Sequence, residues 1–125
     1  MDRWYRYNPN PDGNRTGDCT IRAICRATGK DWDTVFVGVT AFAYSLKDMP
    51  SANHVWGAYL RSQGFRRYLV DDHGQDIYTV HDFCMDNPTG TYVLCIEGHV
   101  VCVDNGCYYD SWDSGAEIPI YYWRR

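Results

Sequence analysis

The sequence predicts an α+β domain in which N-terminal helices pack on a C-terminal antiparallel β-sheet. Helical spacing of apolar residues with stop signals dominates the first half of the chain, and β-type alternation dominates the last third. Between two of the expected strands lies Asn105-Gly106, the strongest short hairpin signal. Helices followed by an antiparallel sheet define the α+β class, and 125 residues suffice for one core. We therefore expect a single domain over residues 1–125.

Helices are expected after an irregular lead-in over residues 1–16, which is rich in Asn, Pro, Gly and Tyr. Each joins an apolar stripe to a residue suited to begin or end a helix. Gly29 can stop the first, Asp31 or Asp33 can cap the second, and Asn53 can cap the third. The expected helices span Asp18–Thr28, Thr34–Leu46 and Asn53–Gly64, with a helical turn over residues 80–87 after Thr79.

The remaining segments read as strands bounded by turn residues. A type I′ turn needs positive φ at both central residues, which Asn and Gly tolerate, so Asn105-Gly106 is expected to join two strands directly. The expected strands cover residues 65–70, Tyr92–Ile96, His99–Asp104, Cys107–Trp112 and Ile118–Trp123.

The hairpin places a histidine and an aspartate on one face. With Asn105-Gly106 as the turn, His99 faces Trp112, and Asp110 is the diagonal neighbour of His99, about 7–8 Å away at the backbone. Asp104 lies on the other face. Asp110 can then orient the imidazole, and Trp112 can cover the pair and exclude water. The alternative is a satisfied polar pair at the rim of a sheet, which the hairpin alone favours equally.

Cys19 stands in the first turn of the first helix, after the flexible Thr16-Gly17. The positive end of the helix dipole favours a thiolate there, and the backbone N–H of Cys19 would point toward an oxyanion formed at its sulfur. Cys25, in the middle of the same helix, is expected to pack. The alternative for Cys19 itself is a buried small residue.

A cysteine that opens a helix, a histidine that begins a strand and an aspartate on the next strand resemble, in this order, the papain-like cysteine peptidase superfamily. Asp110-Ser111-Trp112 is similar to the Asn-Ser-Trp of papain-type enzymes, where the tryptophan shields the His–Asn hydrogen bond. GDCTIRAI resembles the start of bacterial double-glycine-leader peptidases and related small bacterial and phage domains. The resemblance implies Cys19 as nucleophile, His99 as general base and then acid, and Asp110 as the orienting residue.

Two departures from the family pattern leave the chemistry open. The family has a Gln about six residues before the cysteine to complete the oxyanion hole. Here Gly13 has that spacing, so the nearby Asn14, together with the Cys19 N–H, is our candidate. Thr20 follows the cysteine, where peptidases often have Gly or Trp. An amide or isopeptide hydrolase, an acyl transferase of transglutaminase type and an inactive binding module all remain as hypotheses.

The composition predicts the partners and the compartment. A net charge of −4 argues against a nucleic-acid partner, although the Arg66-Arg67 and Arg124-Arg125 pairs weaken that inference. No apolar run approaches the roughly 20 residues that span a bilayer, and the N-terminus lacks the apolar region of a signal peptide. We therefore expect a cytoplasmic monomer with reduced thiols that acts on a peptide or protein. No close Cys or His pairs suggest a metal, and no cofactor is expected.

Overall fold

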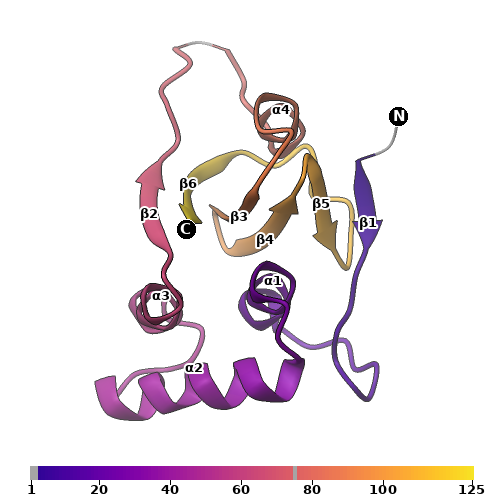
Figure 1. The fold of residues 1–125 in the computed structure, drawn as a ribbon. Helices are drawn as coiled ribbons and strands as arrows, with labels where there is room; N and C mark the ends of the chain where they lie inside the picture. The colour runs from indigo at the N-terminus through magenta and orange to yellow at the C-terminus, as the bar shows by residue number, and fades with distance from the viewer. Residues whose placement is uncertain (1–2, 75) are drawn as a thin grey trace.

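The computed structural model describes residues 3–74 and 76–125 and has the predicted α+β class (Figure 1). Met1 and Asp2, at the start of the predicted lead-in, lie outside the described residues. The elements run in the order β1 (Trp4–Arg6), α1 (Cys19–Thr28), α2 (Trp32–Leu46), α3 (Asn53–Ser62), β2 (Arg66–Leu69), α4 (Val80–Asp86), β3 (Thr91–Ile96), β4 (His99–Asp104), β5 (Cys107–Asp110) and β6 (Pro119–Arg124).

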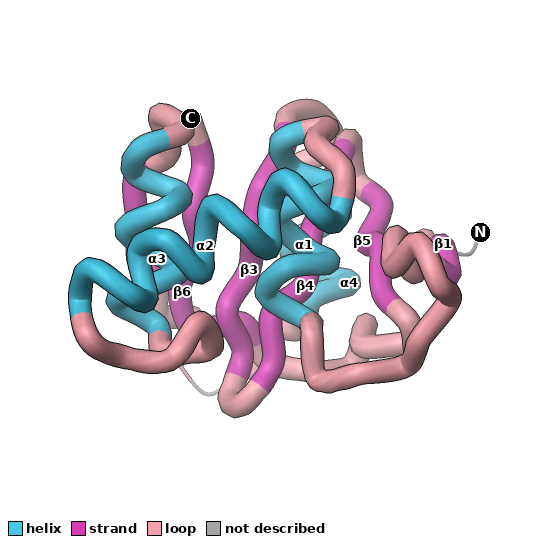
Figure 2. Tube along the Cα trace, turned by 90° about the horizontal axis from the view of Figure 1, so that it is seen from below, coloured by secondary structure: helices cyan, strands magenta, loops and turns pink. Residues whose placement is uncertain are grey.

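Helices cover both faces of the sheet. Helices α1 and α3 lie against one face, with α2 beneath them, and α4 covers the other face (Figure 1). The view from below shows α1, α2 and α3 in front of the strands (Figure 2). Because strand side chains alternate in direction, β3 and β4 supply both cores. Val93 and Cys102 pack with the helices on one face, while Leu94 and Val101 pack with Phe83 of α4 on the other.

The sheet is mixed, whereas the sequence predicted an antiparallel one. Its strand order is β1-β5-β4-β3-β6-β2, and every neighbouring pair is antiparallel except β1 and β5, which run parallel. The lead-in is therefore not wholly irregular. Tyr5 stacks on Tyr109 with ring centroids 5.2 Å apart, and Tyr7 N–H donates to the carbonyl of Asp110 at 2.9 Å. A strand of three residues carries no alternation that local reasoning can detect.

The predicted helices are present with small changes at their ends. Gly29 ends α1 in the left-handed conformation at φ 73°, as expected of a C-terminal glycine. Asp31, rather than Asp33, caps α2 by accepting from Thr34 N–H at 2.8 Å. The N-cap of α3 is Ala52, so Asn53 is the first helical residue and not the cap. Thr79 forms a reciprocal capping box at the start of α4.

The Asn105-Gly106 turn has the predicted conformation, with φ values of 49° and 76°. Asp104 therefore pairs with Cys107, and Cys102 with Tyr109. The expected strand to Trp112 is too long, because β5 ends at Asp110. Beyond that residue the chain bends, and the Ser111 N–H donates to the Asp110 carboxylate at 2.8 Å.

Cysteines in the described chain are unpaired. Cys25, Cys95 and Cys102 are buried among apolar side chains, where they pack as small hydrophobic residues, as predicted for Cys25. Within residues 3–74 and 76–125, no helix has the length and apolar character needed to cross a membrane.

Candidate active site

The predicted catalytic residues lie at the ends of three secondary-structure elements that meet in space. Cys19 is the first residue of α1, His99 the first of β4, and Asp110 the last of β5. The helix packs directly on β4 and β5. Cys19 and His99 line one pocket of about 550 Å³, and Asp110 lies behind His99 at no exposure to solvent. The cysteine, the histidine and the buried carboxylate thus meet at one end of the sheet.

The His99–Asp110 contact is short and enclosed. Nε2 of His99 lies 2.6 Å from Oδ2 of Asp110, which also accepts from the Ser114 hydroxyl at 2.7 Å. Burial raises the pKa of Asp110, but these bonds from His99 and Ser114 outweigh it and hold the pKa below its usual value. The carboxylate is therefore ionised at neutral pH and fixes the imidazole, leaving Nδ1 of His99 for the cysteine.

The His99 side chain and the backbone of Val100 lie beside the Cys19 sulfur, and both favour its thiolate. Burial raises the pKa of the Cys19 thiol, but the hydrogen bond and charge of His99 outweigh it and lower the pKa below its usual value. The charge of Arg22 acts in the same direction. At the buried Cys25 and Cys84, burial dominates and raises the pKa of each thiol to about 12.

The pKa of His99 is shifted in the opposite direction, upward. Burial lowers its pKa, but its bonds to Asp110 and Cys19 outweigh the burial and raise the pKa to about 9. The imidazole is thus protonated across the neutral range, where the thiol of Cys19 has a lowered pKa. The two groups favour a thiolate–imidazolium pair, the reactive form of a cysteine nucleophile.

A buried arginine that the sequence did not reveal as functional joins the helix to the strand. Arg22 donates to Asp18 at 2.7 Å and to Asp110 at 3.1 Å, and the three side chains are nearly inaccessible. Asp18 is the N-cap residue of α1, but its side chain makes no capping bond; it instead accepts from Trp32 Nε1 at 2.9 Å. The available signal was spacing, since Arg22 lies three residues after Cys19 and four after Asp18, on one helical face.

Trp112 contacts His99 without standing opposite it on a strand. The ring centroids are 4.9 Å apart and the planes are tilted by 40°. The indole is 42% exposed, so it covers one side of the imidazole and remains open to solvent on the other. The predicted shielding thus keeps its geometric basis, although the strand expected to carry Trp112 ends at Asp110.

The structure does not bring Asn14 to the cysteine. Asn14 is exposed and lines a separate pocket with Asn8 and Arg15, and its carbonyl accepts from the Asn8 amide at 3.2 Å. The Cys19 N–H, by contrast, belongs to the first turn of α1, where backbone donors have no partner within the helix. A further amide donor, Asn53 of α3, lines the Cys19 pocket, where sequence reasoning had assigned it only a cap.

The other histidines lie outside this pocket, as expected of surface residues. His54 is exposed and pairs with Asp48 at 2.9 Å, and His73 stacks on Tyr78 with centroids 3.9 Å apart. No cluster of three metal-ligating side chains occurs among the residues that the structure describes.

The chain matches no protein-family model, no curated protein and no solved structure. What the fold and site define is a class of arrangement: a cysteine at a helix N-terminus, beside a histidine that a buried aspartate holds. The functional conclusion therefore depends on this geometry and on the motif resemblance.

Proposed function

We propose that this protein is a papain-like cysteine hydrolase that cleaves an amide or isopeptide bond in a peptide or protein. The observation that carries the proposal is the arrangement in which Asp110 holds His99 through a 2.6 Å contact and His99 lies next to Cys19 in one pocket. A cysteine needs a lowered pKa and a neighbouring base to act as a nucleophile, and both conditions hold here.

The reaction follows from these groups. The Cys19 thiolate attacks the carbonyl carbon, and the oxyanion forms near the backbone N–H groups at the start of α1. The His99 imidazolium gives its proton to the leaving nitrogen, the carbon–nitrogen bond breaks, and a thioester remains on the sulfur. Neutral His99 then takes a proton from water, whose oxygen attacks the thioester, and the acid product leaves with Cys19 restored. Asp110 holds the imidazole throughout.

We propose that the enzyme is a cytoplasmic monomer and that it needs no cofactor. The unpaired cysteines of the described chain support a reducing compartment, because a nucleophilic thiolate is readily oxidised elsewhere. Of the two partners proposed for the oxyanion, the Cys19 N–H is favoured by its place in the first turn. Asn14 would need to move from its own pocket to contribute.

Alkylation by iodoacetamide as a function of pH tests the nucleophile. We expect Cys19 to react fastest of the six cysteines and well below pH 8.5, the usual pKa of a free thiol. Cys25 and Cys84 are the internal controls, because both are buried with raised pKa values. Mass mapping of the labelled peptides assigns each rate. Equal labelling of Cys19 and Cys84 would remove the nucleophile from the proposal.

Turnover is tested with fluorogenic peptide and thioester substrates, with Cys19→Ser as the inactive control. Adding a primary amine separates hydrolysis from acyl transfer: a hydrolase releases mainly the free acid, and a transferase releases mainly the amide. Fast Cys19 alkylation without turnover of any substrate would favour the binding module instead.

A further inference from the structure

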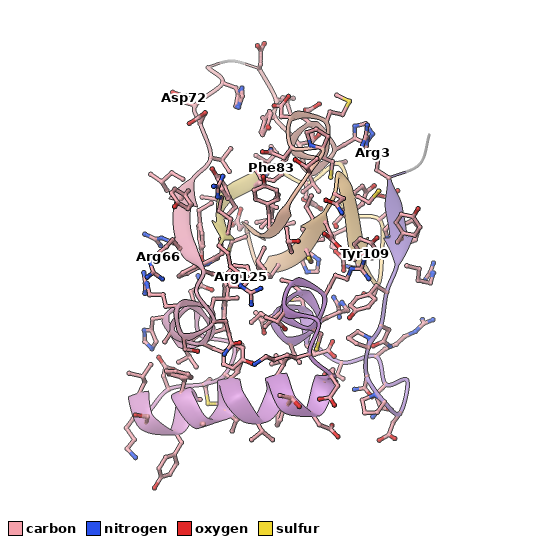
Figure 3. All side chains as sticks on the ribbon, viewed as in Figure 1. Arg3, Arg66, Asp72, Phe83, Tyr109 and Arg125 are labelled. Carbon is pink, nitrogen blue, oxygen red and sulfur yellow. The ribbon has the colours of Figure 1, made fainter. Side chains whose placement is uncertain are left out.

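Five arginines gather at one corner of the molecule, away from the Cys19 pocket. They are Arg61 in the last turn of α3, Arg66 and Arg67 at the start of β2, Arg124 at the end of β6 and Arg125 directly after it. We call this set the arginine corner. All five are exposed, and they account for five of the twelve basic residues in a chain of net charge −4. Figure 3 shows Arg66 projecting outward beside β2.

The corner has no balancing acid. Each ion pair that the described residues form involves Arg22, Arg26, His54 or His99, so none of the five arginines contacts a carboxylate within 4 Å. The sheet register even sets Arg66 directly opposite Arg124. Like charges in this position destabilise a strand pair, so folding alone does not favour the arrangement.

Aromatic rings hold four of these guanidinium groups in place. Arg61 lies 5.0 Å from the Trp123 ring centroid, Arg67 5.0 Å from Tyr121, Arg124 5.8 Å from Tyr68 and Arg125 4.7 Å from Phe65. Stacking leaves the edge of a guanidinium accessible, and a guanidinium held in place loses less entropy when it binds a carboxylate. Arg125 already donates from Nε to the carbonyl of Gln63 at 3.0 Å. Of these rings, Phe65 and Trp123 are buried, which disfavours the base stacking that single-stranded nucleic acid needs, while Tyr68 is 45% exposed.

The strand that carries Arg66 and Arg67 is an edge. β2 pairs with β6 on one side only and ends the strand order, so its outer backbone groups pair with no strand of the described chain. Side chains alternate along it. Arg66 shares one face with Arg124, and Arg67 shares the opposite face with Trp123, on which Arg61 stacks.

We infer that the β2 edge is a docking site for an extended acidic segment of a partner protein, added to the sheet as a further strand. Successive side chains of that segment would point to opposite faces, and each face offers two arginines. The segment should therefore carry at least two consecutive Asp or Glu residues at the level of the arginine corner. Main-chain pairing would supply affinity and the acidic pair would supply specificity. This inference does not depend on the chemistry of Cys19.

Fluorescence anisotropy with short labelled peptides tests it. A β-forming peptide with two adjacent acidic residues is compared with the same peptide carrying Lys at both positions, and with a single-stranded oligonucleotide of equal charge. We expect binding of the acidic peptide alone, weakened by added salt. Arg66→Ser with Arg124→Ser, and separately Arg61→Ser with Arg67→Ser, should each reduce affinity about tenfold.

The matched control removes two exposed basic residues elsewhere, Arg15→Ser with Lys30→Ser, and should change affinity less than about twofold. N-methylation of alternate peptide amides should abolish binding if a strand is added, while leaving the peptide charge unchanged. Tighter binding of the oligonucleotide than of the acidic peptide would overturn the inference. So would the absence of any binding together with faster aggregation of the Arg66 and Arg124 variant, because the arginines would then only protect an edge.

Discussion

Arg22→Met gives the sharpest test of the buried network behind the site. The substitution keeps much of the length of the side chain but removes the cation that lies between two carboxylates. Arg22 donates to Asp18 at 2.7 Å and to Asp110 at 3.1 Å, with no more than 7% of any of the three side chains exposed. Removing one partner of a buried ion pair leaves the other charge without compensation, which typically costs about 3–5 kcal/mol of unfolding free energy.

A second arginine on the same helix provides the matched control. Arg26 also bridges to a strand, donating to Asp104 at 3.0 Å, but its side chain is 36% exposed. It also stacks on Tyr109, with 3.9 Å between its guanidinium carbon and the ring centroid. Arg26→Met should therefore cost only about 1 kcal/mol. Urea unfolding followed by tryptophan fluorescence measures both variants, and a stability loss within 1 kcal/mol of the control would refute the buried network.

The same substitution separates a positioning role from a purely structural one. Arg22 contributes to the low pKa of Cys19, so Arg22→Met should shift the alkylation profile of that thiol to higher pH even where the protein remains folded. Arg22→Lys keeps the charge but cannot bridge two carboxylates with one planar group, so its shift should be smaller. Unchanged alkylation in a folded Arg22→Met protein would limit the arginine to stability.

The remaining predictions concern the partners of His99. Asp110→Asn should lower the pKa of His99 from about 9 and raise the pH at which Cys19 alkylates, because the anion that stabilises the imidazolium is lost. Asp104→Asn, on the other sheet face, should leave that profile unchanged. Equal shifts from both variants would contradict the placement of His99 and Asp110 on one face and Asp104 on the other. Trp112→Ala should reduce turnover more than Trp112→Phe, yet cost less than the 3–5 kcal/mol typical of a fully buried aromatic, because the indole is 42% exposed. A folded Trp112→Ala protein with normal turnover would show that the cover is dispensable.

The hairpin was predictable because the residues that determine it are close together in the sequence. The Asn105-Gly106 turn fixes which residue pairs with which, and the alternation of side chains then places His99 and Asp110 on one face. The position of Cys19 at the start of α1 was also local, because the helix pattern and Gly29 define that helix. Together these two signals were sufficient to bring nucleophile, base and carboxylate into one hypothesis.

Contacts between distant segments were not predictable in the same way. Arg22 and Asp110 are 88 positions apart, and β1 pairs with β5 across about 100 positions. No spacing rule in one sequence encodes such a pairing. Asn14 was the predicted oxyanion-hole donor because of its spacing from Cys19 in the sequence. In an irregular segment, however, that spacing does not determine where a side chain lies relative to the cysteine. The predicted position of Trp112, opposite His99, assumed that β5 continues to residue 112. The strand instead ends at Asp110, where the Ser111 N–H and the Ser114 hydroxyl donate to the Asp110 carboxylate.

The charges of the network explain how one histidine can serve as both acid and base in the proposed reaction. Arg22 balances one of the two buried carboxylates, Asp18 and Asp110, so one negative charge remains to face the His99 imidazolium. The Cys19 thiolate adds a second anion, and both raise the pKa of His99 to about 9. Once the sulfur has bonded to the carbonyl carbon it carries no charge, so one of these two anions is lost and the pKa of His99 falls toward the neutral range. The proton then passes more readily to the leaving amine, and the neutral imidazole is free to activate water. Direct titration supports this sequence if the His99 pKa is lower in protein alkylated at Cys19 than in free protein, and an unchanged pKa would show that the thiolate does not set it.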